Sequence, residues 1–206
     1  MPLRKNLLLL FLLFSLHAAA QDSTYLRVHF LYGSRPLKPY KNAEPKWFGG
    51  MLGGHVGIEG DSGRILNFVP RGKFHWFAKK KNPHSAFAEH NYPDFYAILG
   101  GPGDTVKRAV VTIPVSTQQK QLFDSIASAY LRQTPYDYAL FGMRCGAAAY
   151  EILGQLQILP SYSYGKTYRK IFYPKKLRKR LFRKAAANGW AVQRTQGSAR
   201  RKWERD

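Results

Sequence analysis

The sequence contains one cysteine, Cys145, and few acidic residues. A single cysteine excludes an internal disulfide and leaves too few thiolates for the usual structural zinc sites. Only 12 Asp and Glu stand against 33 Lys and Arg, so the chain is strongly basic. There is no internal repeat or low-complexity tract, and after the first twenty residues no apolar run is long enough to cross a membrane. Residues 21–206 are therefore expected to form one packed domain.

The first twenty residues have the pattern of a secretory signal peptide. Arg4 and Lys5 precede the apolar run at residues 7–16, which is too short to span a bilayer, and residues 18–20 are the alanines of a cleavage site. Gln21 follows this site, and no cysteine nearby offers a point for lipid attachment. We therefore expect a secreted or periplasmic protein without a transmembrane segment in its mature chain.

The positive charge is concentrated toward the C-terminus. Residues 164–206 contain 15 Lys and Arg against 2 acidic residues, whereas residues 21–163 contain 16 against 10. Leu177, Leu181 and Ala185 recur at helical spacing among basic residues, which predicts a basic amphipathic helix. Either its leucines pack on the domain, or the helix binds an anionic membrane or wall polymer. Nucleic acid is not an expected partner of an exported protein. We accordingly divide the chain into a signal peptide (1–20), a main domain (21–163) and a basic extension (164–206).

The segment around Cys145 predicts a cysteine in the first turn of a helix. One face of this helix would carry Cys145, Ala148, Ala149, Ile152 and Leu156. A thiol at a helix N-terminus lies at the positive end of the helix dipole, and Arg144 adds a neighbouring charge, so the thiolate is favoured. An inert buried thiol is the alternative. Packing explains the alanines equally well, but it does not explain a cysteine at the helix start.

The stretch GGHVGIEGDSGRILNFVP, residues 53–70, predicts a β-hairpin with a polar residue on each strand. With residues 60–62 as the loop, His55 and Asn67 are direct cross-strand partners. The Asn67 amide oxygen would then accept a hydrogen bond from the His55 ring and leave the other ring nitrogen free to act on a thiol. The alternative is an edge-of-strand histidine that bonds to the backbone.

The remaining candidate motifs are weaker. His75, His84 and His90 are spaced too loosely for a zinc site, and the GGPGD segment at residues 100–104 lacks the Lys-Ser/Thr of a phosphate loop. We interpret this segment as a turn between two strands, DFYAIL and VKRAVVTIPV. No metal and no cofactor are expected.

The order of these elements resembles the circularly permuted branch of the NlpC-like papain-fold superfamily, which includes the lecithin:retinol acyltransferase-like proteins. The matching segments, spread over roughly residues 25–158, are the predicted hairpin at 53–70, the strand and helix at 111–133, TPYDY at 134–138 and RCGAAAYEIL at 144–153. This resemblance implies Cys145 as nucleophile, with its backbone N–H in the oxyanion hole, and His55 as general base. It also implies Asn67 as the residue that orients His55, and Tyr136 as a residue lining the site. The acyltransferase-like members have a second histidine in place of Asn67, and the basic C-terminal segment matches no part of the family.

We therefore expect an α+β fold of the permuted papain-like type. An antiparallel sheet with His55 and Asn67 would pack against the helix that begins at Cys145, and a basic helical extension would follow. The expected function is that of an exported thiol hydrolase or acyltransferase that cleaves an amide or ester through a cysteine acyl-enzyme. Cell-wall peptides are the first expected substrate and lipid acyl groups the second. The competing hypothesis is a catalytically inert periplasmic module that binds anionic surfaces through its basic C-terminus.

Overall fold

The computed structural model describes residues 24–47, 50–60, 63–79 and 84–206. The predicted signal peptide lies outside the described residues, as does part of the loop that connects the two strands of the predicted hairpin.

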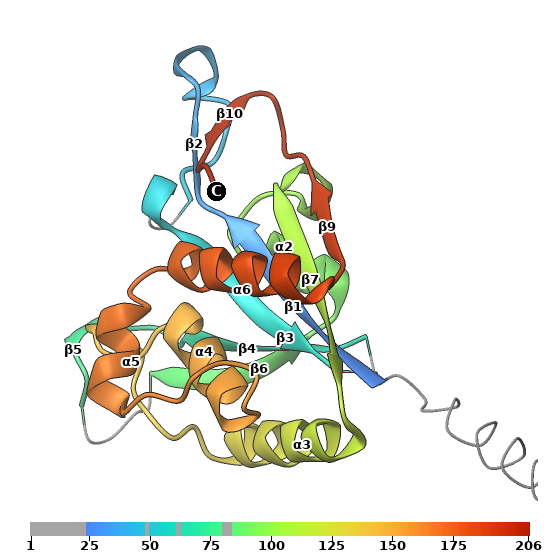
Figure 1. Ribbon diagram of the computed structural model, residues 1–206. Helices are drawn as coiled ribbons and strands as arrows, with labels where there is room; N and C mark the ends of the chain where they lie inside the picture. Colours follow the sequence, from blue (N-terminus) through green and yellow to red (C-terminus); the bar gives the residue numbers. More distant parts are fainter. Residues whose placement is uncertain (1–23, 48–49, 61–62, 80–83) are drawn as a thin grey trace, which may run out of the picture.

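A six-stranded antiparallel sheet forms the centre of the molecule (Figure 1). In spatial order its strands are β6 (Ser85–His90), β4 (Ile65–Pro70), β3 (Gly54–Glu59), β1 (Thr24–Tyr32), β7 (Arg108–Val115) and β9 (Val192–Thr195). Two small sheets lie beside it. One pairs β2 (Ser34–Pro36) with β10 (Arg201–Trp203), and the other pairs β5 (His75–Phe77) with β8 (Ala139–Phe141).

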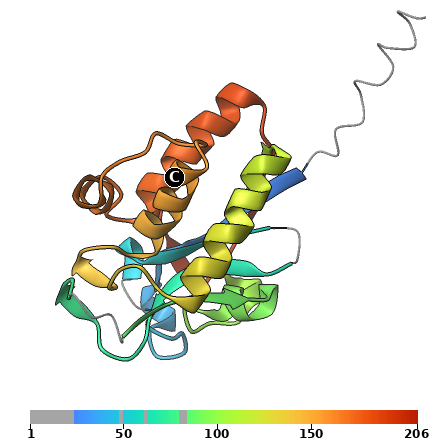
Figure 2. The same ribbon diagram turned by 90° about the horizontal axis from the view of Figure 1, so that it is seen from below.

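Helices cover both faces of the sheet (Figures 1 and 2). One face carries α3 (Thr117–Arg132), α4 (Cys145–Gln155) and α6 (Pro174–Asn188), with α5 (Tyr164–Lys170) packed on α4. The other face carries α2 (Tyr92–Ala97). Three short 3₁₀ turns are η1 (Lys38–Tyr40), η2 (Gly50–Leu52) and η3 (Gly103–Thr105).

Side chains alternate along β1, so its buried residues pack into two cores, one on each face of the sheet. Leu26, Val28 and Phe30 pack into the main core with the residues of α4 and α6, whereas Leu31 packs with Phe95 of α2 in a second, smaller core. Arg27 and His29 also lie on this second face, where they contact Glu59. The mixed α+β fold with an antiparallel sheet is as the sequence predicted.

The segment DFYAIL is not a strand, contrary to the sequence-based prediction. Its first residues lie in α2, because the side chain of Asn91 accepts a hydrogen bond from the backbone N–H of Asp94 at 2.9 Å and caps the helix. Pro93 occupies the first turn, where the missing N–H costs nothing. The following strand, β7, is present as predicted.

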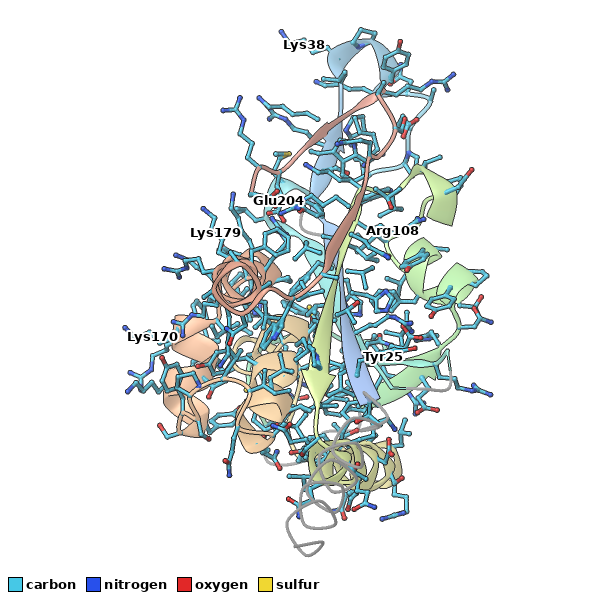
Figure 3. The ribbon with its side chains drawn as sticks, turned by 45° about the vertical axis from the view of Figure 1, so that its right-hand side comes forward. Tyr25, Lys38, Arg108, Lys170, Lys179 and Glu204 are labelled. Atoms are coloured by element: carbon cyan, nitrogen blue, oxygen red, sulfur yellow. The ribbon has the colours of Figure 1, made fainter. Side chains whose placement is uncertain are left out.

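Residues 164–206 are not a separate extension. Helix α6 buries Leu177, Leu181 and Ala185 against the sheet and α4, and β9 continues the sheet as the partner of β7. The leucines of the predicted helix therefore pack on the domain, which was one of its two interpretations. Exposed basic side chains lie on the outer side of α6, as Lys179 does in Figure 3. A run of basic residues therefore does not mark the point in the sequence at which the packed domain ends.

Arg178 is the exception among the basic residues of α6, because it is fully buried. Its Nη1 lies 2.6 Å from Glu204 Oε1, its Nε lies 3.1 Å from Asp206 Oδ1, and its guanidinium stacks 3.8 Å from the ring of Tyr32. These contacts connect α6 to the last residues of the chain and to β1. The C-terminal segment is thus tied to the sheet by charge pairing as well as by apolar packing.

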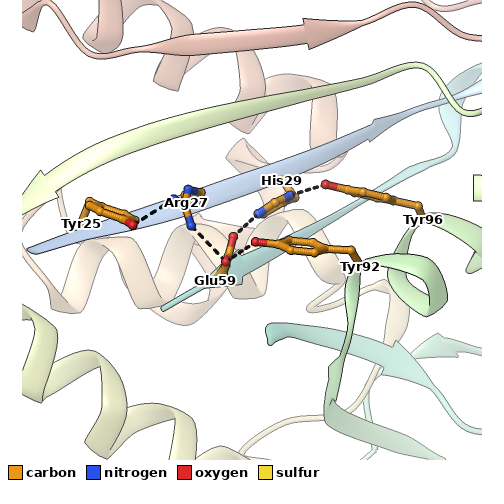
Figure 4. Close-up of polar contacts among 6 residues, drawn as sticks. All are labelled: Tyr25, Arg27, His29, Glu59, Tyr92 and Tyr96. Carbon is orange, nitrogen blue, oxygen red and sulfur yellow. Dashed lines mark hydrogen bonds and ion pairs between the residues drawn. The ribbon is translucent and has the colours of Figure 1, made fainter. Parts of the chain in front are cut away.

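A buried polar cluster joins α2 to the sheet (Figure 4). His29 Nε2 lies 2.8 Å from Glu59 Oε2, Arg27 Nη1 lies 3.1 Å from Glu59 Oε1, and the hydroxyl of Tyr92 donates to the same carboxylate. Burial opposes ionisation of Glu59, but the hydrogen bonds from His29 and Tyr92 and the charge of Arg27 outweigh it and hold the pKa of Glu59 below its ordinary value. The cluster is fully paired and serves the packing of α2.

We expect Glu59→Gln to lower the free energy of unfolding by about 1–3 kcal/mol at pH 7, because it leaves buried donors without their acceptor. The pKa of Glu59 is lower in the folded state, so its stabilisation is complete above the unfolded pKa and is lost as the pH falls through the folded pKa. The difference between wild type and variant should therefore shrink at acid pH in urea titrations. Glu89→Gln, at an exposed position of β6, is the matched control. A difference that is the same at pH 7 and at acid pH would contradict the assignment.

Candidate active site

The pairing of β3 with β4 differs by two residues from the predicted hairpin. Gly57 pairs with Asn67 and Glu59 with Ile65, so Asn67 is not directly opposite His55. The cause is the connection, which runs from residue 60 to residue 64 and is two residues longer than predicted. Because side chains alternate with a period of two, an even shift keeps His55 and Asn67 on the same face. The predicted register was therefore wrong by two residues, but the prediction that the two side chains share a face was right.

Asn67 still binds the His55 ring, now across a diagonal. Its Oδ1 lies 2.9 Å from His55 Nε2, while its Nδ2 donates to the backbone carbonyls of Ile65 at 3.1 Å and Ala88 at 3.0 Å. Since the two carbonyls can only accept, they require the amide nitrogen on their side and direct the amide oxygen toward His55. His55 Nε2 must therefore carry a hydrogen, and the predicted hydrogen bond is confirmed.

Cys145 is the first residue of α4, as predicted, and its thiol interacts with the ring of His55, since each group shifts the pKa of the other. Because Nε2 of His55 is held by Asn67, the nitrogen that faces the thiol is Nδ1. All three side chains are buried. A hydrogen bond joins Asn67 to His55, and an electrostatic interaction joins His55 to Cys145.

The pKa values of Cys145 and His55 shift in opposite directions. Burial opposes ionisation of the thiol, but the charge of His55 and the hydrogen bonds from His55 and Tyr138 outweigh it, so the pKa of Cys145 falls below its ordinary value. Burial likewise opposes protonation of the imidazole, but the attraction of Cys145 and the bonds to Cys145 and Asn67 raise the pKa of His55. The pair thus favours thiolate and imidazolium together.

Tyr138, which the sequence analysis did not select, also contacts Cys145. Its hydroxyl interacts with the thiol of Cys145 and contributes to the low pKa of that thiol. Burial, together with the charge of Cys145, raises the pKa of Tyr138 well above its ordinary value, so the hydroxyl keeps its hydrogen and acts as a donor. The site therefore has two donors beside the sulfur, the Tyr138 hydroxyl and the first N–H of α4.

Tyr136, which the family resemblance placed at the site, does not line the pocket at Cys145. Its ring packs edge-on against Phe68 at a centroid distance of 5.2 Å, and its hydroxyl lies 3.5 Å from Glu151 Oε2. The two tyrosines are two residues apart in TPYDY. The signal for Tyr138 was thus within the quoted motif, but the sequence offered no reason to choose the second tyrosine over the first.

Asp137 holds the Tyr138 segment in place. Its carboxylate accepts hydrogen bonds from Ser85 Oγ at 2.6 Å and from the backbone N–H of Lys79 at 3.0 Å, and it pairs with His75 Nδ1. Burial opposes its ionisation, but these bonds outweigh it and lower the pKa of Asp137. Since Ser85 Oγ also accepts from the backbone N–H of Tyr138 at 2.6 Å, the same cluster positions the tyrosine.

A pocket of about 260 Å³ opens beside Cys145. Its apolar walls are formed by Leu52, Phe74, Leu140, Phe172, Tyr173 and Pro174. Tyr138 and Arg144 also line it. Gly146 permits the start of α6 to approach, because a Cβ at this position would lie 3.1 Å from the backbone of Pro174. Cys145 itself is one of the residues that line this pocket.

Among the residues that the structure describes, no group of three or more His, Cys, Asp or Glu side chains is placed to hold a metal ion. Within the same residues, no helix has the length and apolar character needed to cross a membrane. Searches for related proteins gave no significant match to a protein-family model, a curated protein or a solved structure. The geometry of the site is therefore the basis for a functional proposal.

Proposed function

We propose that this protein is a thiol hydrolase or acyltransferase that cleaves an amide or ester bond through an acyl-enzyme on Cys145. The observation that supports it best is the arrangement of three side chains beside a pocket: Asn67 is hydrogen-bonded to His55, and His55 lowers the pKa of Cys145 at a helix N-terminus. A nucleophile, a base within hydrogen-bonding reach and a third group that orients the base are the parts that nucleophilic catalysis requires.

In the first half-reaction the Cys145 thiolate attacks the carbonyl carbon and forms a C–S bond. The carbonyl oxygen gains the electron pair of its π bond, and the Tyr138 hydroxyl and the backbone N–H of Cys145 are the available donors for this oxyanion. The His55 imidazolium gives its Nδ1 proton to the leaving nitrogen or oxygen as that bond breaks. The products of this step are a thioester on Cys145 and a released amine or alcohol.

In the second half-reaction His55, now neutral, takes a proton from the attacking acceptor. With water as acceptor the C–S bond breaks and a carboxylic acid leaves, whereas with an alcohol or amine the acyl group is transferred. Asn67 keeps the His55 ring in the orientation that both steps need, because it accepts from Nε2 throughout. Both hydrolysis and acyl transfer thus use the same three side chains.

The chain order of these residues agrees with the proposed membership of the permuted NlpC-like papain-fold group. His55 lies on one strand, Asn67 on the next, and Cys145 opens a later helix that packs against both strands. With the proposed export to the periplasm or the cell exterior, cell-wall peptides are the first substrate class, and lipid acyl groups are the second.

The acyl-enzyme provides the direct test of this proposal. After incubation with muropeptides or phospholipids, intact-mass measurement should detect an acyl adduct that peptide mapping assigns to Cys145. Hydroxylamine should remove the adduct, because it cleaves thioesters. Cys145→Ala, which removes the nucleophile and little volume, is the control and should show no adduct. A folded wild-type protein that forms no adduct and no product with either substrate class would contradict the proposal.

The second candidate function is an inert module that binds anionic surfaces. It is favoured by the exposed basic side chains of α6, which include Lys176, Lys179 and Arg183, on the side opposite the buried leucines. This function requires no reactivity at Cys145, and its binding to anionic vesicles would weaken with added salt. Salt-dependent sedimentation with vesicles, together with an unreactive thiol, would favour it over the enzyme.

A further inference from the structure

Arg144 lines the pocket at Cys145 and has no acidic partner among the residues that the structure describes. Its Nε and Nη2 are buried and without a hydrogen-bond partner. The guanidinium plane stacks on the ring of Phe172 at 3.7 Å and lies 5.4 Å from the ring of Tyr173. These rings hold the side chain in position but do not neutralise its charge as a carboxylate would.

Two fully buried arginines of this chain, unlike the half-buried Arg144, show the usual arrangement. Arg178 pairs with Glu204 and Asp206, and Arg201 pairs with Glu44 at 2.9 Å. A charge taken out of water is costly unless it is paired and hydrogen-bonded. Burial lowers the pKa of Arg144, yet a guanidinium remains protonated at neutral pH. Arg144 therefore keeps a positive charge in the wall of the pocket that no carboxylate of the described residues neutralises.

The start of α4 adds to the positive electrostatic potential that Arg144 creates in the pocket. No side chain caps this helix, and its first turn contains no acidic residue. The free N–H groups of a helix N-terminus carry a partial positive charge that favours anions. The helix and the guanidinium are independent features of the fold, and both present positive charge beside the same sulfur.

From this geometry we infer that the Arg144 side of the pocket is a subsite for a carboxylate carried by the acyl part of the substrate, an inference that rests on the proposed function. The guanidinium lines the pocket, where its charge is placed to attract a carboxylate. A fatty acyl chain in the same place would leave the charge unpaired and remove it further from water. The subsite thus selects a peptide with a free carboxylate near the scissile bond over a lipid acyl group.

A pair of alkylating reagents measures the contribution of Arg144 to the binding of a carboxylate. Iodoacetate and iodoacetamide react with the same thiolate and differ in one group, a carboxylate against a neutral amide. Because both rates depend equally on the ionisation of Cys145, a change in its pKa cancels in their ratio. The Arg144→Gln variant should lower the ratio of the iodoacetate rate to the iodoacetamide rate by about tenfold to hundredfold, as expected for the loss of hydrogen bonds to a charged group.

Arg169→Gln is the matched control, since it removes the same charge from an exposed position on α5 that does not line the pocket. Its ratio should equal that of the wild type. A ratio that is unchanged in Arg144→Gln, or that falls equally in both variants, would overturn the carboxylate subsite. If neither reagent labels the folded wild-type protein, the proposed function itself fails, so the two failures are distinguishable.

A measurement on the wild type does not depend on the folding of a variant. N-acetylglycine, which carries a carboxylate, should protect Cys145 from iodoacetamide, whereas the matched neutral compound N-acetylglycinamide should not. Equal protection by the two compounds, or none by either at concentrations up to those of the reagent, would overturn the inference. Near-UV circular dichroism of both Arg variants confirms that the alkylation rates are compared between folded proteins.

Discussion

Replacing His55 by alanine is expected to slow single-turnover acylation of Cys145 by about 10²–10⁴-fold, the usual range for the loss of general acid–base assistance. The variant loses the charge and the hydrogen bond that lower the pKa of the thiol, while burial continues to oppose its ionisation. The pH midpoint of Cys145 alkylation should therefore move upward. His84→Ala, which removes a histidine that contacts neither Cys145 nor Asn67, is the control. Equal acylation rates in wild type and His55→Ala would exclude His55 as the base.

The pH profile of acylation follows from the two opposite shifts. On the acid side the rate rises as Cys145 ionises, below the pH at which a free thiol would. On the alkaline side it falls as His55 loses the proton that the leaving group needs, above the pH at which a free imidazole would. In His55→Ala the alkaline fall should disappear.

Asn67 provides the graded test of the same site. Asn67→Ala removes the acceptor for His55 Nε2, so acylation should lose part, but not all, of the effect seen in His55→Ala. Asn67→His should be tolerated better, because a histidine can also bond to the ring and occurs at this position in the acyltransferase-like proteins that the sequence resembles. Equal rates for wild type and Asn67→Ala, with folding confirmed by circular dichroism, would contradict the orienting role.

Deleting residues 174–206 is expected to unfold the protein. The deletion removes α6 with its buried leucines, the edge strand β9, and the pairing of Arg178 with the chain end. Single Leu→Ala substitutions in cores cost about 2–5 kcal/mol, and a whole domain is stable by only about 5–15 kcal/mol. The truncated chain should therefore lack a cooperative thermal transition and near-UV circular dichroism.

Two point variants measure how much a buried and an exposed position of α6 each contribute to the stability of the fold. Leu181→Ala should lower the free energy of unfolding by about 2–5 kcal/mol, whereas Lys179→Ala, two residues away on the exposed face, should change it by less than about 0.5 kcal/mol. Urea titration of both variants measures the difference. A truncated protein that still unfolds cooperatively would show that the fold does not require residues 174–206.

Local pattern in the sequence was enough to determine several features. The helix that begins at Cys145 could be predicted because its buried face repeats every three to four residues, and a helix enforces that spacing by its own hydrogen bonds. The shared face of His55 and Asn67 could be predicted because alternation along a strand is also a local rule. The position of Cys145 at a helix start and the hydrogen bond between His55 and Asn67 were thus predicted from the residues alone.

Only the tertiary structure decided the features that depend on contacts between distant segments. The β3–β4 register depends on a connection whose length is set by the whole sheet, and Tyr138 rather than Tyr136 meets Cys145 because Asp137 is held by Ser85 and His75. Residues 164–206 belong to the core because burial is a property of neighbours across the fold, whereas charge is a property of composition. For the same reason the unpaired charge of Arg144 became visible only when the residues around it were in place.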